Sequence, residues 1–229
     1  MRTSLTTPEL EGYLGRQIDA LYPDGATYDL GPPVRRALER IEHSFGRNIV
    51  RGYNDARGMA TFSHLHGDQY AAFLYYASHS AWADSGDAGL ASKLFLLNKA
   101  LNGFVCMYDT VLPDVFILVH TVGIVLGKAH YGNYLVVHQN ATVGADARGD
   151  VPKLGERTTL YAGSLVVGSS VVGPRSTVSA NAVLRNEEIP PDSVVAGASP
   201  GLIVKPAGRR MSDLFFGEDP EGRERTVSG

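Results

Sequence analysis

A repeat of six residues runs through the C-terminal half of the chain and constrains its fold more than any other feature. The repeat is marked by an aliphatic residue at every sixth position: Leu154, Leu160, Val166, Val172, Val178 and Leu184. Four residues after each of the first five comes a small residue: Thr158, Ser164, Ser170, Ser176 and Ala182. A helix repeats every 3.6 residues and a strand every two, so neither gives this pattern. A triangular coil of short strands does, with one aliphatic side chain per face stacked inside. The repeat therefore predicts a parallel β-helix of hexapeptide repeats.

Glycines support this interpretation of the repeat. Gly155, Gly163, Gly168 and Gly173 fall where the coil would turn, and we expect them to adopt the positive φ that glycine tolerates. The alternative is a sandwich of short strands, which would show alternation with period two and turn signals every 8–12 residues. The strict spacing at two positions favours the β-helix.

Composition limits the classes of partner. The chain has 229 residues, 44% of them hydrophobic, and a net charge of −3. We therefore expect a globular protein of one large or two small domains that does not bind nucleic acid. It has no apolar run long enough to span a membrane and no signal peptide, so we expect a cytoplasmic protein without a membrane partner. The single cysteine, Cys106, excludes an internal disulfide and a thiolate metal cluster.

The chain before the repeat is predicted to be helical, which makes the fold class α+β. Apolar stripes with helical spacing lie at 10–21, 34–45, 70–81 and 90–101. We therefore predict an N-terminal helical domain over 1–105 that caps the β-helix of 106–206, because an open end would expose strand backbone. Residues 207–229 are expected to form a partly disordered tail, whose apolar segment 214–216 would dock on a neighbour.

Several motifs together resemble the serine acetyltransferases. The most specific has the pattern H-x-x-G-I-V-x-G from His120 to Gly127, and others lie at 139–144, 152–156 and 196–206. The resemblance covers about 105–206. It implies a left-handed β-helix and an enzyme that transfers the acetyl group of acetyl-CoA to a hydroxyl, with no metal. It also implies a homotrimer with the active site between chains, and leaves open a dimer of trimers.

The resemblance makes His120 the general base. A hydroxyl attacks a thioester well only when its proton is accepted as the bond forms, and histidine titrates near neutral pH. A carboxylate on the other ring nitrogen would orient the imidazole. Asp109 and Asp114, both upstream, are the candidates. Transfer would be direct, because Cys106 lies in an apolar setting that suits packing rather than nucleophilic attack.

Other motif positions are assigned to the two substrates. The small residues match the strip along which this family lays the pantetheine arm of CoA, and a lysine matches the basic position near its phosphates. The cofactor-binding candidates are Ala162, Gly163, Ser179, Ala180, Ala198 and Lys205. Gln139 and Asn140 could donate to the thioester oxygen or contact the acceptor.

Two departures from the family affect the acceptor. The family has an aspartate directly before the catalytic histidine, where this chain has Val119, and the arginine and histidine of its Asp-Arg-His-Pro-Lys motif are missing around Val151. Free serine would lose partners for both charges. We therefore expect another hydroxyl-bearing acceptor, such as a sugar or a biosynthetic intermediate. His138, Arg148 and the stretch 55–68, including Asp68, would help to shape its pocket.

Three alternatives remain open from the sequence. An amine acceptor needs the same general base, so N-acyl transfer is the first alternative reaction. A zinc enzyme like the gamma carbonic anhydrases would use three histidines, here His120, His130 and His138. A non-catalytic trimeric scaffold would keep the coil without turnover.

Overall fold

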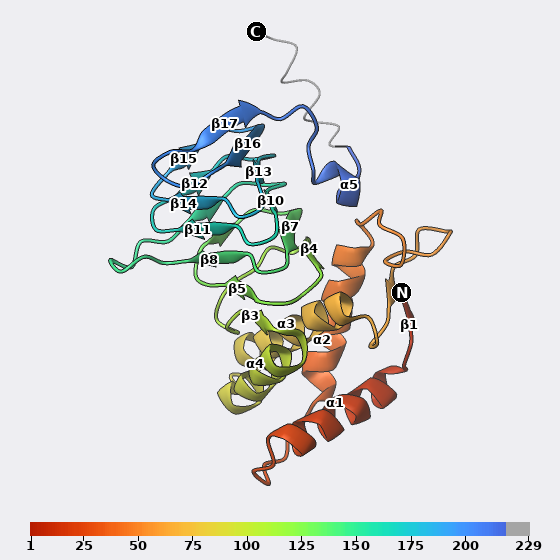
Figure 1. Ribbon diagram of the computed structural model, residues 1–229. Helices are drawn as coiled ribbons and strands as arrows, with labels where there is room; N and C mark the ends of the chain where they lie inside the picture. Colours follow the sequence, from red (N-terminus) through yellow and green to blue (C-terminus); the bar gives the residue numbers. More distant parts are fainter. Residues whose placement is uncertain (219–229) are drawn as a thin grey trace.

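The computed structural model describes residues 1–218 and has two parts, a group of helices and a coil of short strands (Figure 1). The helices are α1 (Thr7–Leu21), α2 (Gly31–Phe45), α3 (Gly67–Ala83) and α4 (Ala88–Asn102). Their ends follow from local chemistry. Thr6 and Glu9 form a reciprocal capping box at the start of α1, Asp87 caps α4, and Gly103 ends α4 in the left-handed conformation. The four predicted helices are confirmed.

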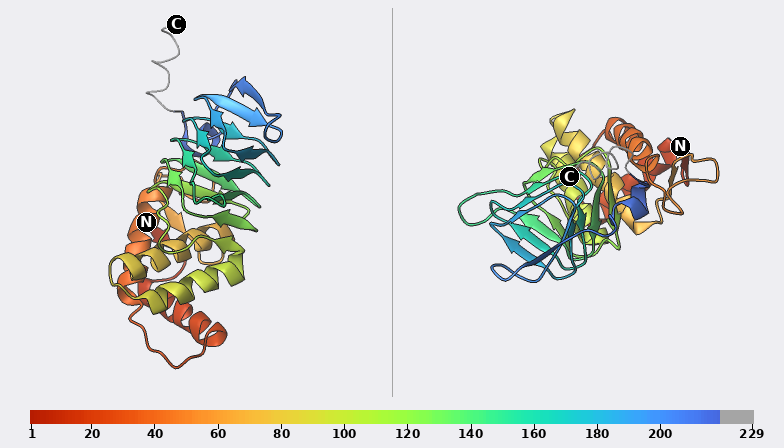
Figure 2. Two further views of the ribbon diagram at one scale, coloured as in Figure 1. Left: turned by 90° about the vertical axis from the view of Figure 1, so that its left-hand side faces the viewer. Right: turned by 90° about the horizontal axis from the view of Figure 1, so that it is seen from above.

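A β-helix follows the helices. Its strands are β3 (Phe104–Val105), β4 (Phe116–Val119), β5 (Ile124–Leu126), β6 (His130–Tyr131), β7 (Leu135–His138), β8 (Thr142–Gly144), β9 (Lys153–Leu154), β10 (Thr159–Leu160), β11 (Leu165–Val167), β12 (Val171–Val172), β13 (Thr177–Val178), β14 (Val183–Arg185), β15 (Glu188–Ile189), β16 (Ser193–Ala196) and β17 (Ile203–Pro206). They form three faces with the orders β17-β16-β13-β10-β7-β4, β14-β11-β8-β5-β3 and β15-β12-β9-β6. Pairing within the faces is parallel except for β17, which runs antiparallel to β16. The coils stack in layers above the helices (Figure 2). The predicted left-handed parallel β-helix behind a helical domain is confirmed.

The six-residue repeat forms the interior of the coil. The six aliphatic residues from Leu154 to Leu184 are at most 3% exposed, and the small residues that follow them are at most 1% exposed. Register places Val137, Leu160, Val178 and Val195 above one another on one face. Each coil therefore contributes one aliphatic side chain per face to a continuous stack, as the spacing predicts.

The corner glycines divide into two kinds. Gly163 and Gly168 have φ of +70° and +68°, as predicted. Gly155 and Gly173 have no positive φ; instead, a Cβ on Gly155 would lie 2.5 Å from the backbone nitrogen of Pro174, and one on Gly173 would meet that of Pro191. At these two positions the prediction of positive φ was wrong, because the corner needs glycine for the close approach of the next coil.

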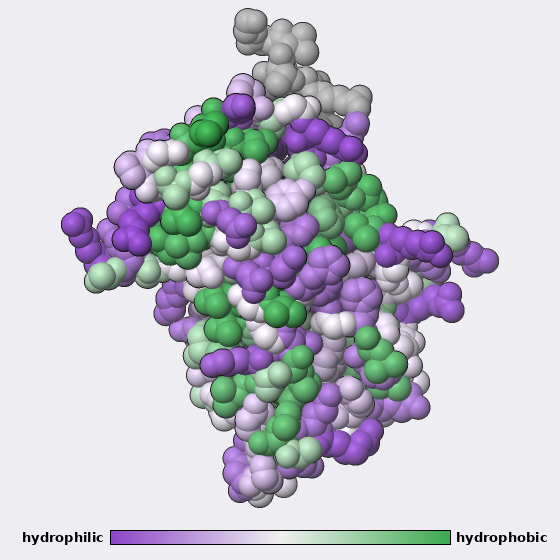
Figure 3. Space-filling model, in the orientation of Figure 1, coloured by the Kyte–Doolittle hydropathy of each residue, from purple (hydrophilic) through white to green (hydrophobic). Residues whose placement is uncertain are grey.

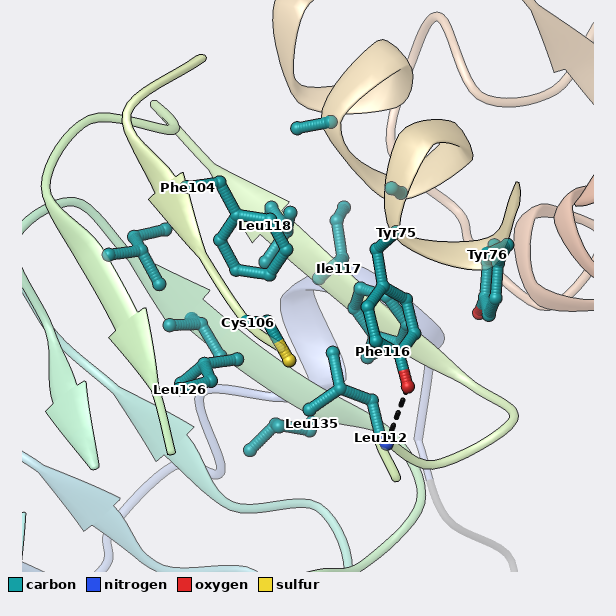
Figure 4. Packing of buried hydrophobic residues seen from close by; sticks show 14 of the residues in the cluster. Tyr75, Tyr76, Phe104, Cys106, Leu112, Phe116, Ile117, Leu118, Leu126 and Leu135 are labelled. Atoms are coloured by element: carbon teal, nitrogen blue, oxygen red, sulfur yellow. Dashed lines mark hydrogen bonds between the residues drawn. The ribbon is translucent and has the colours of Figure 1, made fainter. Parts of the chain in front are cut away.

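The helical part closes the first coil. The Tyr75 hydroxyl, on α3, donates to the Thr110 carbonyl at 2.9 Å. It also accepts from the Leu112 N–H at 2.8 Å (Figure 4). Phe104 and Phe116 of the first strands are 1% and 2% exposed where the coil meets the helices. The helices thus cover the end of the stack, as expected for a cap. Within the helical part, the short strands β1 (Arg2–Thr3) and β2 (Thr61–Phe62) pair in parallel.

The C-terminal segment folds back on its own chain. After β17 it forms α5 (Asp213–Phe216) beside the face that contains β7 and β10 (Figure 1). Phe216 packs edge-on against Tyr134 with ring centroids 5.3 Å apart, and the Ile49 N–H donates to the Phe215 carbonyl at 2.7 Å. The expected docking of 214–216 on a neighbour is therefore corrected for Phe215 and Phe216, which dock within the chain, whereas Leu214 is 39% exposed. The predicted disorder at the end of the tail falls on 219–229, outside the described residues.

The surface agrees with the composition. On the face drawn in Figure 3, apolar side chains form separate patches between hydrophilic ones. Among the described residues 1–218, no helix combines the length and apolarity needed to cross a bilayer.

Candidate active site

The sequence-predicted base lies at an enlarged corner of the first complete coil. The ladder pairs Val119 of β4 with His138 of β7, and Val125 of β5 with Thr142 of β8. Val119 and Val125 are six positions apart, whereas their partners His138 and Thr142 are only four positions apart. The corner between β4 and β5 therefore contains two residues more than the corner between β7 and β8. His120 is one of them, exposed and with φ of 55°. The extra length carries the imidazole out of the regular coil.

Asp68 joins this corner to the helical domain. It is the second residue of α3, and its Oδ2 accepts from the His120 N–H at 3.1 Å. Its Oδ1 accepts from the Thr121 N–H at 2.7 Å and from the Thr121 hydroxyl at 2.6 Å. Because the carboxylate accepts three hydrogen bonds from these two residues, it fixes the backbone of His120 and Thr121. Asp68, predicted to contact the acceptor, is thus found in contact with the corner itself.

A second histidine lies close to the first. His138 ends β7 and stacks on Tyr161, with ring centroids 4.6 Å apart and 12° between the planes, while Phe215 of α5 meets it edge-on. Burial, and next the proximity of His120, lowers the pKa of His138 below its usual value. We therefore expect a neutral His138 imidazole at neutral pH.

Two polar atoms at this place lack a partner among the described residues. They are His138 Nε2 and Gln139 Oε1, both buried. Buried polar atoms are normally hydrogen-bonded, so an orphaned pair indicates a place where a ligand or water can bind. Asn140 differs: it has φ of 58°, its N–H donates to the Val122 carbonyl at 2.8 Å, and its side chain lies against Gly123 where a Cβ would otherwise be.

The two predicted orienting carboxylates lie elsewhere. Asp109 Oδ2 is 3.0 Å from Lys128 Nζ. Asp114 Oδ1 is 3.8 Å from Arg40 Nη2 and borders a cavity of about 430 Å³ that is lined mainly by α2 and α3. In the described part of the chain neither forms a hydrogen bond or ion pair with His120. Their orienting role stays a prediction.

A shallow apolar cavity of about 290 Å³ lies higher on the face that carries His138. Its lining residues are Tyr161, Thr177, Ser179, Ala180, Val194, Arg209 and Met211. Ser179 and Ala180 were predicted from the sequence, and Lys205 is the ladder partner of Val194. The other cofactor candidates lie at corners: Gly163 beneath the Asn181 side chain, Ala162 one residue earlier, and Ala198 bridged to Val183. The structure thus brings part of the predicted strip together with Arg209.

A three-histidine metal site is not formed within one chain. His130 lies on β6, in a different face of the coil from His138. Across residues 1–218, no three side chains of the ligating types come together.

Comparison with known proteins identifies relatives of one kind. No protein-family model matches the chain. A serine acetyltransferase of Synechocystis sp. is 30% identical over 112 residues, 47% of this chain and 44% of that protein. One of Mycobacterium tuberculosis is 26% identical over 144 residues, 58% of this chain and 62% of that protein. The match therefore spans roughly half of the relatives' length.

Solved structures extend the likeness to both parts of the molecule. A Neisseria gonorrhoeae serine acetyltransferase in complex with serine superposes with a TM-score of 0.66 at 18% identity, covering 88% of this chain and 84% of that one. Isoform 3 from Entamoeba histolytica, in complex with cysteine, gives 0.59 at 20% identity, covering 86% and 73%. At such identities the superpositions show a shared fold. The chain is similar in sequence to serine acetyltransferases and shares their fold. The resemblance predicted from its motifs is confirmed.

Sequence reasoning missed several residues of the candidate site. Tyr161 stands one position after Leu160, as Ser179 does after Val178, so the repeat itself could have placed Tyr161 on the outer face. Phe215 and Met211 lie in the tail, and no periodicity relates them to the coil. Thr121 had no signal beyond its place beside His120.

Proposed function

We propose that the protein is an acetyl-CoA-dependent O-acyltransferase in which His120 is the general base. The observation that carries this proposal is the position of His120, in its H-x-x-G-I-V-x-G segment, on the enlarged corner of a β-helix that is similar to serine acetyltransferases. One such neighbour was solved in complex with CoA, with a TM-score of 0.58 at 18% identity.

The reaction needs one proton to move twice. The acceptor hydroxyl attacks the thioester carbonyl carbon while the His120 imidazole takes the hydroxyl proton. The C–S bond then breaks, and the imidazolium returns the proton to the leaving thiolate. No enzyme nucleophile is required. Cys106 is a poor one, because it is 3% exposed and burial raises the pKa of its thiol well above the usual range.

The apolar cavity beside Ser179 and Ala180 fits the donor. A thin pantetheine arm needs a surface without large side chains, and Ala180 provides it. Arg209 in the same lining, and Lys205 on the neighbouring strand, supply positive charge suited to the phosphates of CoA.

The acceptor is proposed to be a hydroxyl compound other than free serine. Val119 and Val151 offer no partner for an ammonium or a carboxylate. His138 Nε2 and Gln139 Oε1 would instead hydrogen-bond an uncharged polar group of the acceptor.

We further propose a homotrimer, as the family resemblance implies, which light scattering after size exclusion would test.

The first test is binding of acetyl-CoA by titration calorimetry. Wild type should bind, Ala180→Trp should lose binding because the indole fills the cavity, and Ala20→Trp on the exposed surface of α1 should bind normally. Absence of binding by wild type would refute the acyltransferase.

Acceptor screening would then compare L-serine, sugars and a matched amine, with His120→Ala as the inactive control. Best activity with L-serine would refute the acceptor proposal, and best activity with the amine would establish N-acyl transfer.

A further inference from the structure

We propose that Asp68 is a positioning residue that holds the His120 corner in its working conformation. The proposal rests on the role of His120 put forward above. Its basis is the contact of one carboxylate with three donors, all from two consecutive residues of the corner: the N–H groups of His120 and Thr121, and the Thr121 hydroxyl.

The corner needs this support because the coil does not supply it. Ladder pairing fixes Val119 on one side and Val125 on the other, and the next coil has no residues opposite the two additional ones. His120 also has φ of 55°, a conformation that costs energy for any residue with a Cβ. Without an external partner the backbone would relax and carry the imidazole with it.

A carboxylate in the first turn of a helix has a simpler explanation, which is stabilisation of that helix. Asp87 of this chain is an example, since its Oδ1 accepts from the Leu90 N–H of the helix it precedes, at 2.9 Å. Asp68 is different. Both of its oxygens accept hydrogen bonds from residues 52 and 53 positions further along the chain. The contact therefore joins the helical domain to the β-helix at the proposed base.

Four variants separate the two roles. Asp68→Ala removes all three hydrogen bonds. Asp68→Asn keeps one acceptor oxygen for Thr121. Its amide nitrogen would face the His120 N–H, so two donors would meet and that hydrogen bond would be lost. Thr121→Val removes only the hydroxyl donor and leaves both backbone bonds, so it remains informative if Asp68→Ala does not fold. Asp87→Ala is the matched control, because it removes a helix cap that has no contact with the corner.

The direct readout is hydrogen exchange of the His120 and Thr121 amides by NMR, which needs neither substrate. Asp68→Ala should accelerate their exchange at least tenfold, on the order of the loss of a hydrogen bond to a charged acceptor. Asp68→Asn should accelerate His120 more than Thr121. Asp87→Ala should leave both amides unchanged. Equal exchange in wild type and Asp68→Ala would overturn the proposal.

The kinetic readout uses the best acceptor from the screen. A displaced base lowers the rate of the chemical step, so Asp68→Ala should reduce kcat by about 10–100-fold while the Kd for acetyl-CoA stays within about twofold. Faster exchange with unchanged kcat would overturn the positioning role. If wild type transfers no acetyl group, the proposed function fails, whereas the corner contact is still decided by exchange.

Discussion

Replacement of Gly155 by alanine tests how closely the coils approach at their corners. Gly155 has no positive φ, so alanine meets no backbone restriction there. Its new methyl group, however, would lie 2.5 Å from the Pro174 nitrogen, 2.7 Å from the Pro174 Cα and 2.9 Å from the Gly173 carbonyl carbon. All three atoms belong to the backbone of the next coil, so no side chain can rotate away and the two coils must separate.

The expected cost follows from overpacking. Forcing an extra methylene into a packed interior costs about 1–3 kcal/mol, and more where the surroundings cannot move. Alanine also reduces the entropy of the unfolded chain, which stabilises by about 0.4–1 kcal/mol. We therefore expect a net loss of about 1–2 kcal/mol in the free energy of unfolding, which lowers Tm by roughly 2–8 °C for a chain of this size.

Thermal unfolding followed by circular dichroism measures this change, and Gly144→Ala is the control. A Cβ on Gly144 would meet nothing within 4 Å, and its φ is also not positive. That variant should be unchanged or slightly more stable. A Gly155→Ala protein that melts at or above the wild-type temperature would refute the close-approach explanation.

Two further predictions concern pH and the tail. Burial lowers the pKa of both His79 and His138 from 6.5, so the folded protein binds fewer protons than the unfolded one. The free energy of unfolding is therefore highest with respect to these two groups above about pH 6.5, and it declines as pH falls through their lowered pKa values. Urea titrations from pH 7.5 to 5 should show this decline. The free energy of unfolding should depend less steeply on pH in a His79→Gln/His138→Gln double variant. An identical slope would contradict it. Phe216 is 8% exposed against Tyr134, so Phe216→Ala should release α5 and speed proteolysis of 207–217 at least tenfold, on the order expected from loss of a buried ring. Leu214→Ala, at a side chain that is 39% exposed, should have little effect, and equal cleavage of the two variants would show that Phe216 does not anchor the segment.

The fold was predictable because each turn of the coil repeats one local rule. An inward position such as Leu160 meets its counterparts Val137 and Val178 whatever the rest of the chain does, so spacing alone determines the stack. The helices were predictable for the same kind of reason, since their apolar stripes face one core. The predicted reason for Gly155 was wrong because positive φ and close approach both select glycine, and a sequence does not distinguish them.

The contacts of the candidate site are of another kind. Asp68 is 52 positions before His120 and lies in a polar stretch without periodicity, so nothing local indicates which backbone it will meet. Docking of Phe215 on His138 likewise joins residues that are far apart in sequence. These contacts depend on the path of irregular segments, and hydrophobic spacing carries no information about that path.

The additional residues at the first corner connect these observations. A regular β-helix holds every residue by ladder pairing and presents short corners, which is a stable arrangement with little freedom to project a side chain. Lengthening one corner projects His120, but it also removes the ladder bonds that would fix the new residues. Local departures of this kind are expected at functional sites and need support from elsewhere in the molecule. Here the support comes from the first turn of α3, so the helical domain does more than cover the end of the coil: it supplies the hydrogen bonds that the lengthened corner lost.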